Sequence, residues 1–252
     1  MRDGAAHPFS VIDARLLRRH ALVSIARDHH AALSDTVEDG SLRRAVTQWL
    51  ARGTPLVVRR QNSDVAIETM PTTIAVGMPL SPVEGRHRLA FTLPAHAIAA
   101  LAPPIALADA AARLASSWRA PLTRLADAAT AIDVTLRVFG SVAWEALTGA
   151  TYVARDSDVD VLWRPVDTAQ LRAGIALLHR WERETGISAD GEILFGDDAA
   201  VAWREWDRVA QANDPASRVL VKTLRGSHLV APEALLARLG ADASAVANMA
   251  CA

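Results

Sequence analysis

The chain has 252 residues, of which 51% are apolar and 22% are charged, so it has the composition of an ordinary globular protein with a sizeable core. Its formal net charge of −1 provides no overall basic field for nucleic acid. The single cysteine, Cys251, excludes a disulfide framework and a cysteine-ligated zinc site. Pro103, Pro104 and Asp109 interrupt the alanine-rich stretch 95–115, which is therefore unsuited to spanning a bilayer. We expect a cytoplasmic protein without a membrane or nucleic-acid partner.

Residues 1–94 predict a smaller N-terminal α+β domain. Residues 41–52 are typical of a helix, with Ser41 as a candidate N-cap. Short apolar runs predict strands at 19–25, 54–60, 73–80 and 86–94. Prolines punctuate residues 94–104, where we place the domain boundary.

Residues 105–252 predict a second domain with a mixed sheet and flanking helices, so the fold class is α+β or α/β. Residues 106–131 favour two helices broken at Pro121, and Gly149 is typical of a residue that ends a helix. The other helices are expected at 141–149, 168–184, 203–211 and 232–239. Strands are expected at 133–140, 157–163, 187–195, 199–205 and 218–230, of which 187–195 and 199–205 would form a hairpin.

A strand, a Gly140-Ser141 corner, a helix and a second strand follow one another between residues 133 and 163. A glycine at such a corner lets a phosphate approach the backbone, and the helix N-terminus offers free N–H groups to an anion. Ser141 could cap the helix or bind phosphate directly.

The second strand carries Asp158 and Asp160, whose spacing of two directs both carboxylates to one face. Two carboxylates beside a phosphate site favour Mg²⁺, which takes hard oxygen ligands and substrate phosphates. A third carboxylate from a neighbouring strand would complete a two-metal site. Asp190 and Glu192 are the two candidates for it, and we favour Asp190.

Two other interpretations apply to the acidic segment 156–160. A calcium loop would need glycine at its sixth position, where Val161 stands, and usually glutamate at its twelfth, where Asp167 stands. Alternatively, the acids are solvated residues at the start of a strand, and Asp156 is then a turn or cap residue. The Gly-Ser corner upstream favours the metal site over both.

The order of Gly-Ser, Asp-x-Asp and a later strand carboxylate resembles the polymerase-β-type nucleotidyltransferases, although residues 148–156 form a longer loop than many members have. The segments RHALV, TPLVVRR, AVGMPLSP, RHRLAF, DGEILFGDDAAVAWREW and VLVKTLRG, together with SDVDVL, resemble malonate decarboxylase holo-acyl-carrier-protein synthases, also called phosphoribosyl-dephospho-CoA transferases. This resemblance covers about residues 15–235.

The resemblance implies an enzyme that moves a phosphoribosyl-dephospho-CoA group from triphosphoribosyl-dephospho-CoA to a serine of the apo acyl-carrier subunit of malonate decarboxylase. Pyrophosphate would be released. It also implies that Asp158, Asp160 and Asp190 are catalytic metal ligands and that Gly140 and Ser141 hold the pyrophosphate portion. The alternatives are another nucleotidyltransferase, which adenylylates a small molecule or protein, and a catalytically silent module that binds a carrier protein.

Lys222, Arg155 and Arg59 are further candidates for binding phosphate. Lys222 lies within a strand and is either solvated or positioned to neutralise charge in the transition state. Arg155 lies in the loop beside the acids, where it forms a salt bridge or binds phosphate. Arg59 and Arg60 end a strand and point to opposite faces, so only one of them can face the cleft.

Overall fold

The computed structural model describes residues 17–61, 72–196, 198–212 and 214–239. Strands and helices are mixed along the whole described chain, which confirms the expected α+β class. The described residues divide into two compact units, the first containing residues 17–59, 72–78 and 90–103 and the second containing residues 60–61, 79–89 and the described part of 104–239. No described helix has both the length and the apolar character that a membrane crossing requires.

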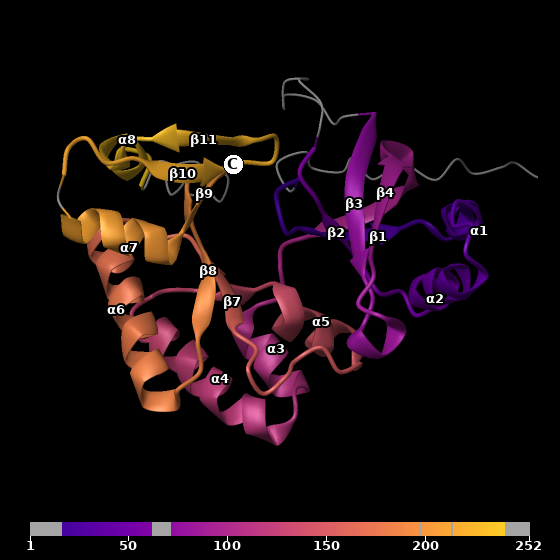
Figure 1. Ribbon diagram of the computed structural model, residues 1–252, viewed down its shortest axis with the longest axis horizontal. Helices are drawn as coiled ribbons and strands as arrows, with labels where there is room; N and C mark the ends of the chain where they lie inside the picture. Colours follow the sequence, from indigo (N-terminus) through magenta and orange to yellow (C-terminus); the bar gives the residue numbers. More distant parts are fainter. Residues whose placement is uncertain (1–16, 62–71, 197, 213, 240–252) are drawn as a thin grey trace, which may run out of the picture. The chain divides into compact units, whose positions relative to one another are not determined.

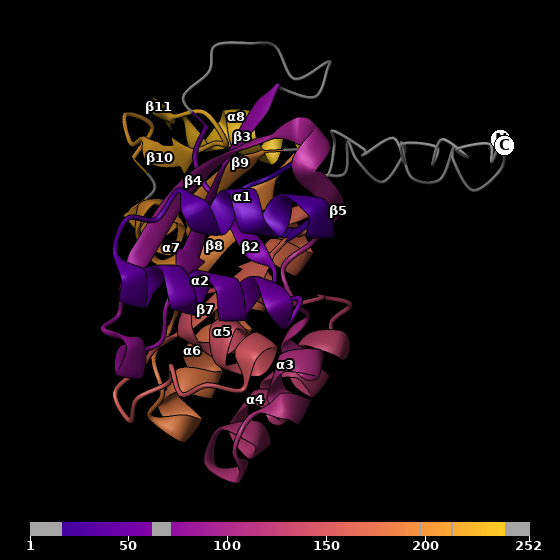
Figure 2. The same cartoon turned by 90° about the vertical axis from the view of Figure 1, so that its right-hand side faces the viewer.

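The first unit contains two α-helices and a five-stranded sheet, except for residues 79, 88 and 89 of that sheet, which belong to the second unit (Figure 1). The sheet has the strand order β4-β3-β2-β1-β5, and β1 lies between β2 and β5, antiparallel to both. Its strands are β1 (Leu22–Ile25), β2 (Leu56–Val58), β3 (Thr73–Pro79), β4 (Arg88–Pro94) and β5 (Ile98–Ala102). The helices α1 (His30–Asp35) and α2 (Gly40–Ala51) lie together on one side of this sheet (Figure 2). α2 buries Val46, Trp49 and Leu50.

Two features of this unit differ from the sequence prediction. The N-cap of α2 is Asp39, not Ser41, because Asp39 Oδ1 accepts hydrogen bonds from the backbone N–H groups of Ser41 and Leu42 at 2.8 and 2.9 Å. The stretch 94–104, which we took as a boundary, contains the strand β5. Its small residues pair along β1, and alanine gives little strand signal in a sequence.

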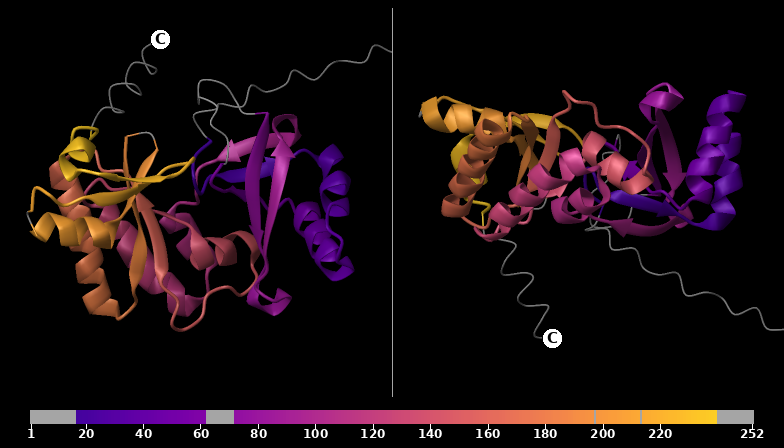
Figure 3. Two further views of the ribbon diagram at one scale, coloured as in Figure 1. Left: turned by 45° about the horizontal axis from the view of Figure 1, so that its top comes forward. Right: turned by 90° about the horizontal axis from the view of Figure 1, so that it is seen from below.

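The second unit contains a six-stranded sheet in the order β11-β10-β9-β8-β7-β6 (Figure 3). β7 and β8 are parallel, and the other pairs are antiparallel. The strands are β6 (Arg137–Val138), β7 (Val159–Trp163), β8 (Ala189–Phe195), β9 (Ala199–Ala202), β10 (Val219–Lys222) and β11 (Ser227–Val230). The helices are α3 (Leu107–Arg113), α4 (Ser116–Thr130), α5 (Gly140–Thr148), α6 (Thr168–Thr185), α7 (Trp203–Ala212) and α8 (Pro232–Leu236).

The helical break in 106–131 was predicted at the wrong place. Pro121 lies inside α4, and the chain is interrupted at Leu114 and Ala115, which have extended backbones. Pro121 comes early in the helix and is buried, and its carbonyl oxygen accepts a hydrogen bond of 3.0 Å from Trp181 Nε1. Tertiary packing therefore outweighs the helix-breaking tendency of this proline.

The region 218–230, which we expected to be one strand region, is a hairpin of β10 and β11. The two strands pair from Val219 with Val230 to Lys222 with Ser227. A turn over 223–226 joins them, and in it Thr223 N donates to Gly226 O at 2.8 Å.

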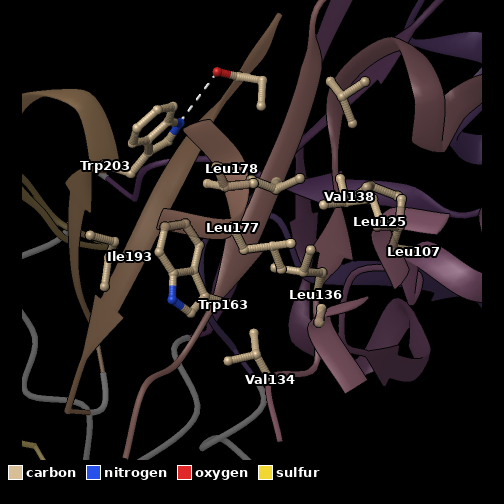
Figure 4. Close-up of a cluster of buried hydrophobic side chains, with 14 of the residues drawn as sticks. Leu107, Leu125, Val134, Leu136, Val138, Trp163, Leu177, Leu178, Ile193 and Trp203 are labelled. Carbon is tan, nitrogen blue, oxygen red and sulfur yellow. Dashed lines mark hydrogen bonds between the residues drawn. The ribbon is translucent and has the colours of Figure 1, made fainter. Parts of the chain in front are cut away.

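Alternation along β7 and β8 separates the core from the site. Val159, Val161 and Trp163 belong to the buried cluster on one side of the sheet. Leu107, Leu125, Leu177 and Leu178 of the helices contribute to the same cluster around Trp163 (Figure 4). Trp203 joins this core and donates from Nε1 to the backbone oxygen of Ala189 at 3.3 Å. The residues between these core positions on β7 and β8 must face the opposite side of the sheet.

Candidate active site

Three carboxylates meet at the start of the parallel strand pair. Asp158 directly precedes β7, Asp160 is its second residue, and Asp190 is the second residue of β8. The register of the two strands places Asp160 opposite Asp190. One carboxylate oxygen from each of the three residues lies within 4.8 Å of the others. The structure thus brings together the three acids that the sequence analysis named.

Glu192, the other candidate for the third carboxylate, lies two residues further along the same face of β8 and has a different environment. It is only 4% exposed, and its Oε1 lies 3.0 Å from Lys222 Nζ. Asp190, by contrast, is exposed, and its Oδ1 accepts from the backbone N–H of Gly191 at 2.8 Å. Glu192 therefore neutralises a lysine, whereas Asp190 is available to a ligand.

Asp160 is the most strongly perturbed acid of the cluster. Burial raises the pKa of its carboxyl group to about 7, and the charges of Asp158 and Asp190 add to this effect. Glu192 also raises this pKa, and Arg88 lowers it with a smaller effect. The negative charge at the site is therefore only partly balanced by the chain itself.

These residues fit a divalent cation. Three carboxylates on neighbouring strands are a hard oxygen donor set of the kind that Mg²⁺ prefers. Burial and, after it, the neighbouring carboxylates raise the pKa of Asp160, and a bound cation would favour its ionised form against both effects.

The N-terminus of α5 adjoins the carboxylates. Phe139 N donates to the backbone oxygen of Asp160 at 3.1 Å, which fixes the start of the helix beside β7. Gly140 has a φ of +65°, and a Cβ added there would lie 1.9 Å from Asp160 Oδ2. Only glycine fits this position, both for its backbone conformation and for its contact with the acid.

Ser141 does not cap α5. The N-cap position is Phe139, whose side chain makes no capping hydrogen bond to the helix. The free N–H groups and the helix dipole make this turn suited to an anion such as phosphate. Of the two roles that the sequence left open for Ser141, the structure rules out N-capping.

An ordered loop, residues 149–158, connects α5 to the acids. Glu145 Oε2 accepts from the backbone N–H groups of Tyr152 and Val153, each at 2.9 Å. The Tyr152 hydroxyl donates to the backbone oxygen of Pro79 at 2.8 Å, within the second unit. Burial, followed by the charge of Glu84, raises the pKa of Tyr152 to about 12. Glu145 thus holds the loop from α5.

The predicted basic residues have different placements. Lys222 pairs with Glu192, as described above, and Arg155 lies in an exposed turn of the 149–158 loop. Arg59 follows β2 in the first unit, and its side chain packs over Gly77. A Cβ added to that glycine would lie 3.1 Å from Arg59 Cδ.

Sequence reasoning missed two residues near the site, Glu145 and Tyr152, and did not connect Arg88 with Asp160. The hydrogen bonds of Glu145 and Tyr152 become visible only in three dimensions. Arg88, in the second unit, is the cation whose charge acts on Asp160. It stands about 70 positions before that acid in the chain, so no local spacing connects the two.

Comparisons with known proteins give a consistent result. Residues 18–104 match the family model of the phosphoribosyl-dephospho-CoA transferase MdcG N-terminal domain, and residues 106–233 match that of its C-terminal domain. A phosphoribosyl-dephospho-CoA transferase of Xanthomonas euvesicatoria pv. vesicatoria is 39% identical over 218 residues, which cover 86% of this chain and 95% of the relative. A protein of the same name from Bradyrhizobium diazoefficiens is 32% identical over 206 residues, covering 82% of this chain and 86% of the relative. No solved structure matches the chain.

Proposed function

The chain belongs to the family of phosphoribosyl-dephospho-CoA transferases, and we propose that its acceptor is a serine of the apo acyl-carrier subunit of malonate decarboxylase. The donor would be 2′-(5″-triphosphoribosyl)-3′-dephospho-CoA. The group transferred is the 2′-(5″-phosphoribosyl)-3′-dephospho-CoA group, and the leaving group is pyrophosphate.

The observation that carries this proposal is the cluster of Asp158, Asp160 and Asp190 beside the uncapped N-terminus of α5. A triphosphate donor needs a divalent-cation site and a separate place for phosphate oxygens. An acidic cluster alone would provide no place for phosphate oxygens, and a helix N-terminus alone would provide no cation site.

In the proposed reaction the carrier serine attacks the α-phosphorus in line with the leaving group. A bond forms between serine Oγ and phosphorus as the bond from phosphorus to the pyrophosphate oxygen breaks. Asp190 orients the serine hydroxyl and takes its proton. The backbone N–H groups at Gly140 and Ser141 bind the pyrophosphate portion. Most of the rate enhancement would come from positioning and charge stabilisation.

Asp158, Asp160 and Asp190 would hold Mg²⁺, which supplies positive charge to offset the phosphates when it is bound. Arg88 adds a fixed positive charge near Asp160. Arg155 lies in the adjoining loop and is a further candidate for contact with donor or carrier.

Intact-mass analysis of the apo carrier subunit tests this function directly. After incubation with the enzyme, the donor and Mg²⁺, the carrier should gain the mass of the phosphoribosyl-dephospho-CoA group. A parallel reaction with ATP as the donor should leave the carrier mass unchanged. A gain of an adenylyl group would show adenylylation instead, and no gain with either donor would indicate a silent binding module.

Single substitutions test the assignment of the third carboxylate. Asp190→Asn should lower the transfer rate by at least about a hundredfold, because an amide is a much weaker ligand and base than a carboxylate. Glu192→Gln, the matched control on the same face of β8, should cost less than about tenfold, because the Glu192 carboxylate pairs with Lys222 and is not needed as a cation ligand. The reverse order of effects would assign the third position to Glu192.

A further inference from the structure

A pocket of about 460 Å³ lies in the first unit, at the point where β1 ends near the C-terminus of α2. Ser24, Ile25 and Arg27 contribute to it from the β1 side, and Leu50, Arg52 and Thr54 contribute from the α2 side. Its volume falls within the range of small-molecule sites, which is about 300–1,000 Å³.

The charge of this pocket is positive. Arg27 and Arg52 both line it, and neither takes part in an ion pair within the described part of the chain. His30 also lines it, with its Nε2 held 3.2 Å from the backbone oxygen of Ile25. None of the described residues that form its walls is acidic. Two arginines that lack a carboxylate partner and share a concave wall are suited to an anionic ligand.

The end of α2 does not cancel this charge through free carbonyl groups. The backbone N–H of Arg52 donates to Gln48 O, that of Gly53 to Leu50 O, and that of Thr54 to Trp49 O. These bonds engage the carbonyl groups of Gln48, Trp49 and Leu50, three of the last four of the helix, so those groups repel an anion less than free carbonyls would. The hydroxyl groups of Ser24 and Thr54 add neutral donors to the wall, and Ile25 and Leu50 add buried apolar surface.

We propose that this pocket binds a diphosphate group. Two guanidinium groups and two hydroxyls match the paired charges and many acceptor oxygens of a diphosphate better than those of a single carboxylate. The diphosphate has two sources, the ester within the dephospho-CoA part of the donor or free pyrophosphate. The apolar surface of Ile25 and Leu50 favours the ester, which carries organic groups on both sides. This choice of source rests on the function proposed above.

Direct binding to the full chain tests the pocket independently of transfer. Calorimetric titrations with dephospho-CoA and with pyrophosphate would be carried out in excess chelator, so that the carboxylate cluster holds no cation. The double variant Arg27→Gln/Arg52→Gln should weaken the affinity for dephospho-CoA by at least about tenfold. Arg44→Gln, an exposed arginine on the same helix, is the matched control and should change the affinity by less than about twofold.

Further measurements keep the result interpretable. Equal melting temperatures of the double variant and the wild type would show that the variant folds. The variant Arg27→Lys/Arg52→Lys should recover part of the affinity, because it retains the charge. An alternative result is that pyrophosphate binds as tightly as dephospho-CoA and loses affinity in the glutamine double variant to the same extent. That result would identify free pyrophosphate as the ligand and overturn the assignment to the donor.

Unchanged affinities for both ligands in the glutamine double variant would overturn the pocket itself. That result would leave the proposed function intact, because transfer is read from the carrier mass. Conversely, a failure of transfer would not remove the difference in affinity between the wild type and the double variant, because the titrations contain no carrier.

Discussion

Asp160 keeps its proton to a higher pH than an ordinary aspartate, since its pKa is raised from 3.8 to about 7 by burial and by neighbouring carboxylates. In the unfolded chain the same group ionises near its usual pKa. The folded state therefore binds this proton more tightly, and its contribution to stability is complete below about pH 4. Without a metal, the contribution of the protonated carboxyl group to the free energy of unfolding is lost as the pH rises from about 4 to about 7.

At high pH without a metal, the folded state bears the cost of an ionised Asp160 carboxylate in a buried, negatively charged site. The variant Asp160→Asn removes this cost, so in chelator at pH 8 it should be more stable than the wild type by on the order of 2 kcal/mol. At pH 4 the difference should nearly vanish, because the wild-type carboxyl group is then protonated. Thermal melting of both proteins at the two pH values measures it. An equal difference at both values would contradict the assigned titration. The same variant should lose transfer activity, since it loses a metal ligand.

Gly140 and Gly149 begin and end the same helix, and both have positive φ angles, of 65° and 72°. A Cβ at Gly140 would overlap Asp160, whereas one at Gly149 would meet nothing within 4 Å. Gly149→Ala should therefore cost only about 1 kcal/mol of stability, from backbone strain, with activity retained. Gly140→Ala should in addition displace the acid and lower transfer by about a hundredfold. Equal activity of the two variants would show that the contact with Asp160 is unimportant.

Single-residue spacing predicted part of the site and could not predict the rest. Asp158 and Asp160 are two apart on a strand, so their shared face follows from the sequence. The partnership of Asp160 with Asp190 depends on the register across the intervening helix α6, which spacing does not fix. Arg88 and Glu145 reach their positions through tertiary structure alone.

At the scale of elements, the loop 149–158 depends on α5 through Glu145. Glu145→Ala would leave the backbone N–H groups of Tyr152 and Val153 without this acceptor. We expect the loop to open more often, so that trypsin cuts after Arg155 several times faster, a change on the order of 1 kcal/mol in the opening free energy. Mass spectrometry of the fragments follows the cut at this bond.

The control for this experiment is Glu184→Ala, because Glu184 is an exposed residue of α6. It should leave the cleavage rate after Arg155 unchanged. A similar acceleration in both variants would mean that general destabilisation, and not the loss of the Glu145 contacts, exposes the loop.

The elements themselves were largely predictable because their apolar periodicity is strong, as in α6 and in β7 and β8. The errors arose where a local rule met a tertiary contact. Pro121 is accommodated in α4 by tertiary packing, since it is buried and its carbonyl oxygen accepts from Trp181 Nε1, so the expected break does not occur there. Asp39 and Ser41 are both residue types that favour the N-cap position, and the structure has Asp39 there, two residues before the predicted Ser41. β5 is recognisable only through its pairing with β1.

At the scale of the whole molecule, the family resemblance inferred from short motifs is confirmed by matches to both family models. The resemblance could not indicate whether the acidic cluster binds a cation. Since a ligand that binds only the folded state stabilises it, Mg²⁺ should raise the melting temperature. At about 100 times its dissociation constant the expected increase is about 5 °C or more.

This increase should be measured at pH 8, where the carboxylates are ionised, against a sodium salt of equal ionic strength. The double variant Asp158→Asn/Asp160→Asn should show no increase. An increase of the same size in that variant would locate the cation elsewhere in the chain.

The chain contains one tyrosine, Tyr152, and its hydroxyl group contacts the backbone of Pro79. An alkaline ultraviolet difference spectrum of the entire protein therefore reports a single phenol at a single known contact. While the phenol stays buried beside Glu84, half-ionisation is expected near pH 12, and once it is exposed the midpoint should fall towards 10. The protein thus carries its own optical probe for the loop beside the carboxylates, and no label has to be introduced.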